Sequence, residues 1–231
     1  MKMAVFLLSF IFLFISSASA ACNQCVLSKA AFFASSKGLS TGACGYGPLA
    51  LNMYGGHVAA AAPSLYKKGE GCGACYQIRC KNSGICSTRG TEIVVSDIHT
   101  GNTTDFVLSS RAFRAMALPG KDKQLLQIGI ANVEYRRVPC VYKGQNLTIR
   151  VAEFSKPPNY LAIQVLYQGV FDTSNAPTGK LILRFIINSG FDARYFQAGE
   201  VLPANWKPGV VYQSKAQIKD VALDGCAPCK P

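Results

Sequence analysis

The chain has 231 residues, of which 24 are lysine or arginine and 12 are aspartate or glutamate, giving a formal net charge of +12. This length allows one large domain or two small ones. The basic residues are scattered and do not cluster on one predicted helix, which argues against a nucleic-acid-binding protein. The charge favours contact with anionic surfaces, and simple solubility is the alternative explanation.

Residues 1–20 have the features of a secretory signal peptide. Lys2 gives a positive start, residues 4–15 form an almost unbroken apolar run, and Ala-Ser-Ala at residues 18–20 matches a cleavage site. The run is shorter than the roughly 20 apolar residues that span a bilayer, although a retained membrane anchor is the alternative. We therefore expect a secreted, extracellular protein that begins near Ala21 and is not held in a membrane.

All ten cysteines follow this segment. An even number of cysteines behind a signal peptide predicts disulfides formed in an oxidising compartment. Two C-x-x-C pairs, Cys22/Cys25 and Cys226/Cys229, lie at the two ends. They would suggest zinc in a cytosolic protein, but in a secreted one we expect disulfides and no metal.

The distribution of cysteines also predicts where the chain divides. Eight cysteines lie between Cys22 and Cys140, and none follows until Cys226. We therefore expect a first domain over residues 21–141 and a second domain over residues 145–231.

The first domain is predicted to consist of short strands separated by glycine turns. Residues 92–96 and 128–138 are strand candidates. Residues 110–117 are rich in alanine, arginine and methionine and predict a helix, with Ser109 or Ser110 as its N-cap. Short strands in a glycine-rich, disulfide-linked chain favour a barrel.

The second domain shows clearer alternation of apolar and polar residues. The pattern recurs in residues 147–152, 161–167 and 181–187, and residues 217–221 are a candidate last strand. Period-two alternation indicates half-buried strands. The sum is a small antiparallel β-sandwich.

Four separated segments carry a resemblance to a known family. Three cysteines with glycines occur in residues 71–80, and further motifs lie in residues 41–47, 109–117 and 138–140. In this order they resemble the expansin superfamily of plant cell-wall proteins, and the terminal C-x-x-C pairs resemble its expansin-like A subgroup. The resemblance implies a mainly β protein: a six-stranded double-psi β-barrel, similar to family-45 endoglucanases, followed by an immunoglobulin-like β-sandwich, similar to a carbohydrate-binding module.

The resemblance also implies a disulfide pattern, which spacing alone cannot fix. The implied pairs are Cys44–Cys72, Cys75–Cys140 and Cys80–Cys86. We hypothesise that bonds between the two terminal C-x-x-C pairs tie the chain ends together, in an order that the sequence leaves open.

Glycoside hydrolysis normally needs two carboxylates. The related endoglucanases carry an acid on a His-Phe-Asp motif, and at the matching positions Asp105 replaces the histidine and Val107 replaces the acid. Asp105 could replace the lost acid only if the backbone shifted. Because consecutive strand residues point to opposite faces, an offset of one residue would turn its side chain away from the position of the acid, unless the segment is a loop. Asp97 matches a groove aspartate of many expansins. We expect no catalytic residue, and retain Asp97 and Asp105 as polysaccharide-binding candidates, with a turn cap and a solvated loop residue as the respective alternatives.

The two histidines, His57 and His99, are 42 residues apart, and no serine or cysteine nucleophile signature lies near them. We interpret neither as catalytic. No phosphate loop or nucleotide fingerprint appears, so we expect no cofactor.

Tyrosines near the glycine turns of the first domain could stack on sugar rings or belong to the core. Tyr46 is the best contact candidate among them because it lies in a Gly-Tyr-Gly turn. In the second domain, the resemblance makes Tyr160 one residue of an aromatic platform. We expect Trp206, the only tryptophan, to pack in the core.

The second domain is shortened relative to the family pattern. After Gly169, roughly thirty residues, or about three strands, are missing. An incomplete gene model or alternative transcript would explain the gap, and the alternative is a genuine isoform with weakened polysaccharide binding.

Two sequons, Asn102-Thr103-Thr104 and Asn146-Leu147-Thr148, are candidate glycosylation sites. Asn102 is the stronger candidate because it lies in a polar loop.

These observations favour a monomeric cell-wall protein that binds cellulose, xyloglucan or pectin and loosens the wall without hydrolysis. Two alternatives stay open: a weak endoglucanase that uses Asp97, and a binding or signalling module that uses the barrel alone.

Overall fold

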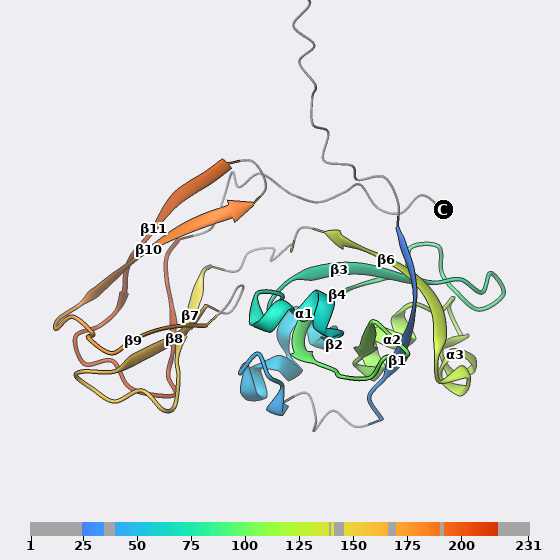
Figure 1. Ribbon diagram of the computed structural model, residues 1–231, viewed down its shortest axis with the longest axis horizontal. Helices are drawn as coiled ribbons and strands as arrows, with labels where there is room; N and C mark the ends of the chain where they lie inside the picture. The colour runs from blue at the N-terminus through green and yellow to red at the C-terminus, as the bar shows by residue number, and fades with distance from the viewer. Residues whose placement is uncertain are drawn as a thin grey trace, which may run out of the picture.

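The computed structural model describes residues 25–34, 40–138, 140, 146–165, 170–189 and 192–216. Over these residues the chain is mainly β, with a closed six-stranded barrel followed by a second β-domain (Figure 1). The predicted fold class is confirmed. The predicted signal peptide, the strand expected at residues 217–221 and three of the four terminal cysteines, Cys22, Cys226 and Cys229, lie outside the described residues.

Six strands close the barrel in the order β1-β5-β2-β4-β3-β6. They are β1 (Val26–Phe32), β2 (Val58–Ala61), β3 (Cys75–Cys80), β4 (Thr91–Ile98), β5 (Phe106–Leu108) and β6 (Ala131–Val138). Strand β1 pairs in parallel with β5 and antiparallel with β6, which closes the circle. Strands β2 and β4 form a second parallel pair.

Aromatic rings fill the inside of the barrel. The ring of Phe106 lies 4.9 Å from that of Tyr135 and 5.2 Å from that of Tyr76, measured between centroids. Phe106 and Leu108 are fully buried, whereas Val107 between them is half-exposed. Strand β5 therefore shows the period-two alternation of a strand with one face in the core.

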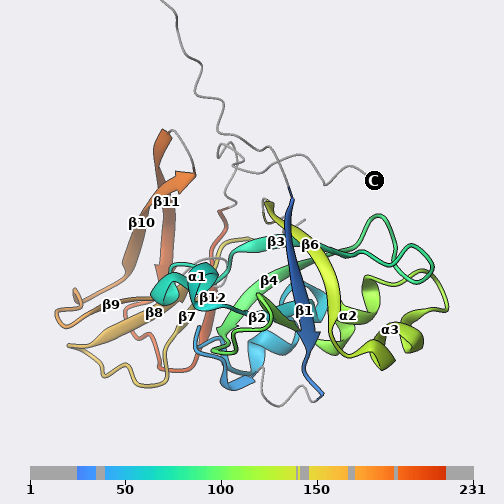
Figure 2. The same cartoon turned by 45° about the vertical axis from the view of Figure 1, so that its right-hand side comes forward.

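Short helices connect the barrel strands. They are the 3-10 helices η2 (Gly47–Leu51), η3 (Met53–Gly56) and η4 (Lys67–Gly69) and the α-helices α1 (Pro63–Tyr66), α2 (Ser110–Ala115) and α3 (Asp122–Ile128). Two views show α2 and α3 on the side of the barrel away from the second domain (Figures 1 and 2). The predicted N-cap is Ser109, whose hydroxyl accepts a hydrogen bond from the Ala112 amide.

One predicted element differs from the structure. The strand expected over residues 128–138 begins only at Ala131, because residues 122–128 form α3. Leu125 of α3 is fully buried in the barrel core. The apolar residues at the start of the predicted strand, Ile128 and Ile130, are instead 45% and 50% exposed.

Three disulfides staple the first domain. They join Cys44 to Cys72, Cys75 to Cys140 and Cys80 to Cys86. These are the pairs that the family resemblance implies. Cys25 is also disulfide-bonded, to a partner outside the described residues.

The second domain packs two sheets around one core. Its four-stranded sheet has the order β12-β7-β8-β9, and β10 pairs with β11 in a separate hairpin. The strands are β7 (Thr148–Val151), β8 (Leu161–Val165), β9 (Val170–Thr173), β10 (Leu181–Ser189), β11 (Asp192–Leu202) and β12 (Val211–Gln213). Trp206 is buried among Ile149, Val151 and Leu202, as expected of a core residue.

The aromatic cluster generates a test of barrel stability. Replacing Phe106 by alanine should lower the free energy of unfolding by about 3–5 kcal/mol, because it opens a cavity inside the closed barrel. The neighbouring change Val107→Ala should cost only about 1 kcal/mol, since this side chain is half-exposed. Urea unfolding followed by circular dichroism measures both. Equal losses for the two variants would contradict the assignment of the two faces of β5.

The terminal cysteines generate a second test. We predict that the partner of Cys25 is Cys226 or Cys229, so that a covalent link joins the two ends of the chain. Peptide mapping under non-reducing conditions should recover one linked pair of N-terminal and C-terminal peptides that separates on reduction. Recovery of a Cys22–Cys25 bond would refute the prediction.

Candidate functional site

Strand β2 organises the candidate site. All four of its residues are fully buried, and it is hydrogen-bonded to β4 on one side and β5 on the other. In this register Ala60 has Asp97 of β4 as one neighbour and Val107 of β5 as the other. A register shift in β4 at this point leaves Ser96 without a partner on β2. Such bulges re-aim the next side chain, here that of Asp97.

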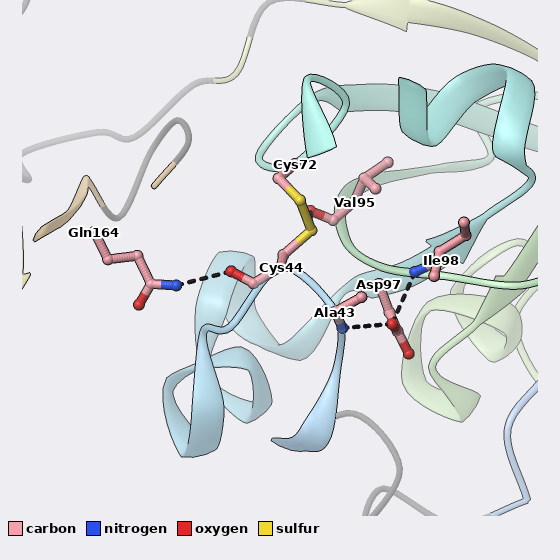
Figure 3. Close-up of a disulfide and its surroundings, with 7 residues drawn as sticks. All are labelled: Ala43, Cys44, Cys72, Val95, Asp97, Ile98 and Gln164. Atoms are coloured by element: carbon pink, nitrogen blue, oxygen red, sulfur yellow. Dashed lines mark hydrogen bonds between the residues drawn. A yellow bond between two sulfur atoms is a disulfide. The ribbon is translucent and has the colours of Figure 1, made fainter. Parts of the chain in front are cut away.

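The Asp97 carboxylate is held through one of its two oxygens. Its Oδ1 accepts hydrogen bonds from the amides of Ala43, at 2.6 Å, and Ile98, at 2.8 Å (Figure 3). Its Oδ2 has no partner among the described residues. Asp97 therefore caps a turn, and its second oxygen is available to accept a hydrogen bond from a ligand hydroxyl.

The turn that Asp97 caps approaches the strand closely. A side chain at Gly42 would place its Cβ 2.6 Å from the backbone oxygen of Ser96 and 3.1 Å from Cβ of Asp97. Only glycine fits there without displacing the strand. The next residue but one, Cys44, is bonded to Cys72, so the turn is fixed covalently as well.

Tyr66 is an aromatic neighbour of Asp97 that the sequence did not single out. It ends α1 and is half-buried. Burial raises the pKa of its hydroxyl, and the negative charge of Asp97 raises it further. No motif links these residues in the sequence, because Tyr66 and Asp97 come together only through the barrel.

Tyr46, the predicted sugar contact, lies in the interior. Only 1% of its surface is exposed, and it packs against Cys44, Cys72 and Tyr66. Burial raises the pKa of its hydroxyl, and Tyr66 adds to the effect. This burial argues against the prediction, because a ring inside the core has no face for a sugar. The glycines beside Tyr46 let the chain turn inward rather than outward.

Asp105 is half-buried directly before β5 and is not the solvated loop residue considered from the sequence. Its carboxylate interacts with the hydroxyl of Tyr135. Burial raises the pKa of Tyr135, and the charge and hydrogen bond of Asp105 raise it further. Asp105 thus already has a partner within the barrel, which weakens its candidacy as a ligand contact.

His99 shapes the loop that carries the Asn102 sequon. Its Nδ1 accepts a hydrogen bond from the Gly101 amide at 3.0 Å, so its Nε2 carries the proton and donates to the Thr104 carbonyl at 2.6 Å. Asn102 is exposed on this loop, whereas Asn146 is half-buried next to buried Leu147. Both ring nitrogens of His99 are engaged within the loop, which accords with a structural role.

The second domain contacts the same turn as Asp97. The side-chain amide of Gln164, from β8, donates to the backbone oxygen of Cys44 at 2.8 Å (Figure 3). Gln164 is only 3% exposed. Beside it, the Arg150 guanidinium lies against Gly47, which has no side chain to block it. A buried hydrogen bond and a close backbone contact therefore join the two domains.

Two aromatic residues lie together on the second domain. The rings of Phe154 and Tyr160 have centroids 6.1 Å apart and are inclined by 36°. Phe154 is 61% exposed, and Tyr160 is half-exposed. Tyr160 was predicted as a platform residue, and Phe154 is its unpredicted neighbour. Phe154 lies in a turn, outside the alternating strand patterns from which the second domain was predicted.

Neither a metal centre nor a membrane span is found in the part of the chain that the structure describes. No three histidine, cysteine, aspartate or glutamate side chains there converge as metal ligands do. None of the described helices combines the length and the apolar character needed to cross a bilayer.

The barrel matches a known protein family. Residues 58–135, from β2 into β6, match the family described as "Lytic transglycolase". In overall structure the chain is similar to the apo Clavibacter michiganensis expansin, with a TM-score of 0.63 and 18% identity over 86% of this chain and all of the other. A mutant of that expansin in complex with cellohexaose gives a TM-score of 0.61.

Curated plant proteins match nearly the whole chain. Expansin-like A2 of Arabidopsis thaliana is 48% identical over 255 positions, covering 97% of this chain and 96% of the relative. Expansin-like A3 of the same plant is 47% identical over 259 positions, covering 99% and 98%. Expansin-like A3 of Oryza sativa subsp. japonica is 40% identical, covering 77% and 74%.

The alignments with the two Arabidopsis proteins are longer than the 231 residues of this chain. Those relatives therefore contain residues without a counterpart here. The identities and coverage, together with the barrel and its disulfides, show that this chain belongs to the expansin-like A group of the expansin superfamily.

Proposed function

We propose that this chain is a secreted plant cell-wall protein that binds wall polysaccharide as a monomer and loosens it without hydrolysis. The observation that carries the proposal is the pair of residues flanking Ala60, which are Asp97 on one side and Val107 on the other. Only one of these two positions has a carboxylate.

The spacing makes this replacement significant. Two strand-to-strand steps of about 4.8 Å separate the backbones of Asp97 and Val107, or about 10 Å in all. Inverting glycosidases hold their two carboxylates about 6.5–9.5 Å apart, one as acid and one as base. Val107 therefore stands near the position where a second carboxylate would be needed, and a valine can neither donate nor accept a proton.

Binding requires less than hydrolysis. The Oδ2 of Asp97, which has no partner among the described residues, suits a sugar hydroxyl. Tyr66, whose pKa the charge of Asp97 raises, is an aromatic candidate for the same ligand. Phe154 and Tyr160 add exposed aromatic surface on the second domain, and aromatic faces stack on the C–H faces of sugars. Many such weak contacts can replace those between neighbouring polysaccharide chains, which loosens the network without breaking a covalent bond.

The related proteins support the ligand class. The Clavibacter michiganensis protein of the same fold has been crystallised with cellohexaose, a glucan fragment. The net charge of +12 also favours acidic polysaccharide such as pectin. We therefore propose cellulose, xyloglucan or pectin as partners, and a glycan on the exposed Asn102.

A weak endoglucanase is the second candidate function. The match of residues 58–135 to the lytic transglycolase family favours it, together with the available oxygen of Asp97. It would need a second carboxylate near Asp97.

The first test replaces Asp97 by asparagine. The change removes a charged acceptor worth about 1.5 kcal/mol or more in a hydrogen bond, so affinity for cellohexaose should fall about tenfold. Isothermal titration calorimetry measures the affinity, and Asp122→Asn on α3 is the matched control that should leave it unchanged. Unchanged affinity in the Asp97 variant would exclude this carboxylate from the binding site.

The same variant distinguishes binding from hydrolysis. We expect the unmodified protein to release no reducing sugar from soluble glucan during long incubation. Release that disappears in Asp97→Asn would establish the endoglucanase and refute the non-hydrolytic proposal.

A further test concerns the aromatic pair. Phe154→Ala and Tyr160→Ala should each weaken binding to insoluble cellulose about fivefold, because each removes a stacking contact worth about 1 kcal/mol. Ile182→Ala is the control, since Ile182 is also exposed and apolar in the second domain. Depletion assays measure the bound fraction. If neither aromatic change has an effect, the barrel alone carries binding, as expected of a binding or signalling module that uses only the first domain.

A further inference from the structure

A pocket lies at the other end of β2 from Asp97. It has a volume of about 460 Å³, within the range of roughly 300–1,000 Å³ that small-molecule sites occupy. Its lining residues are His57, Ser110, Arg111, Arg114 and Ala115. Four of these five residues belong to α2, and this helix lies on the side of the barrel away from the second domain (Figures 1 and 2).

The chain builds this pocket by bonding the turn before β2 to the start of α2. The Ser109 hydroxyl donates to the Gly56 carbonyl at 2.7 Å, and Arg111 Nη1 donates to the Gly55 carbonyl at 2.7 Å. Gly56 has a φ of +81°, and a Cβ there would lie 3.2 Å from Arg111 Nη1. The turn therefore holds the Arg111 guanidinium in one place, and glycine is needed to do so.

The positive charge of the pocket is not neutralised. Arg111 and Arg114 are three residues apart on α2 and so share one face of the helix. Neither forms an ion pair with a described residue, and the pocket lining contains no acidic side chain. The nearby Glu92 carboxylate accepts a hydrogen bond from the Tyr54 hydroxyl.

Neutral groups complete the lining. Burial lowers the pKa of His57; a hydrogen bond to the Glu92 backbone opposes this, and Arg111 lowers the pKa further. His57 is therefore neutral at pH 7, with one ring nitrogen as a donor and the other as an acceptor. Its Nδ1 is hydrogen-bonded to Thr91 Oγ1 at 2.9 Å, which leaves Nε2 for a ligand. Ser110 adds a hydroxyl and Ala115 a small apolar surface. The pocket thus offers two guanidinium groups next to donors and acceptors without charge.

We propose that this pocket binds a carboxylated sugar, a uronic acid residue of a wall polysaccharide. Arg111 and Arg114 pair with the carboxylate, since guanidinium groups match its geometry through two parallel N–H donors. His57 and Ser110 contact ring hydroxyls. The inference rests on the proposed function only in taking an extracellular polysaccharide as the ligand.

The two ends of β2 would then select different sugars. His57 and Ala60 are three residues apart, or about 10 Å along the strand at about 3.3 Å per residue. The Asp97 carboxylate repels a uronate and accepts hydrogen bonds from a neutral sugar, whereas the arginine pocket attracts the uronate. Repulsion at one site and attraction at the other give specificity that neither contact provides alone.

The experiment measures binding of trigalacturonate and of its methyl ester to the intact protein by titration calorimetry at low salt. We expect trigalacturonate to bind at least tenfold more tightly than the ester. Arg114→Gln should reduce trigalacturonate affinity at least fivefold and leave cellohexaose affinity unchanged; the Arg114 side chain has no hydrogen bond with any described residue, so the fold should persist. The control is Lys207→Gln, which removes one exposed charge from the second domain.

Three outcomes would overturn the proposal. The first is equal affinity for trigalacturonate and its methyl ester. The second is an equal loss of trigalacturonate affinity in the Arg114 and Lys207 variants. The third is binding of inorganic sulfate, measured by its displacement of trigalacturonate, that is as strong as binding of trigalacturonate itself. The first removes the carboxylate requirement, the second leaves only diffuse charge, and the third leaves an anion site without sugar recognition. If trigalacturonate binds as expected while cellohexaose does not bind at all, the Asp97 groove fails as a glucan site and the pocket stands.

Discussion

Strand β2 is the constraint on which the barrel and its surface chemistry depend. Its four residues are fully buried, three of them alanines, so β4 and β5 pack closely on either side. Ala59 and Ala61 share the barrel core with Phe106, so larger side chains at these positions would overpack it. This strand fixes the spacing between Asp97 and Val107. The turn that precedes it, at residues 55–57, is bonded to the start of α2. A larger residue here would disturb both ends at once.

The chemistry of this barrel depends on the two residues that flank Ala60, of which one is an aspartate and the other a valine. The strands place two positions at a spacing that suits a pair of carboxylates, and one of them is Val107. The remaining carboxylate of Asp97 binds two backbone amides through a single oxygen. A carboxylate held in this way keeps its orientation, which suits recognition of hydroxyls. A barrel that offers one oriented carboxylate at these two positions, instead of two, is thus compatible with the proposed binding function.

Sequence patterns and family motifs together predicted the architecture, but only part of the site. Alternation located β7, β8 and β10, and Ser109 marked the start of α2, because these signals are local. The positions of Asp97 and Val107 followed from motifs in register with the family. Tyr66 was missed and Tyr46 was misplaced, since whether a tyrosine beside a glycine turn points inward depends on contacts far along the chain. The arginine pocket was missed for the same reason, because residues 55–57 meet α2 only after β2 is in place.

The turn at residues 42–45 connects three parts of the molecule in series. The Asp97 carboxylate holds the Ala43 amide, the Cys44–Cys72 disulfide locks the next residue, and the Cys44 carbonyl accepts a bond from Gln164 of the second domain. A force that pulls the domains apart would therefore be transmitted to this turn through the Gln164–Cys44 hydrogen bond. The Cys44–Cys72 disulfide joins this turn covalently to the barrel, so it would carry part of that load alongside the hydrogen bond between Ala43 and Asp97. The same turn thus couples the orientation of the Asp97 carboxylate to the contact between the two domains.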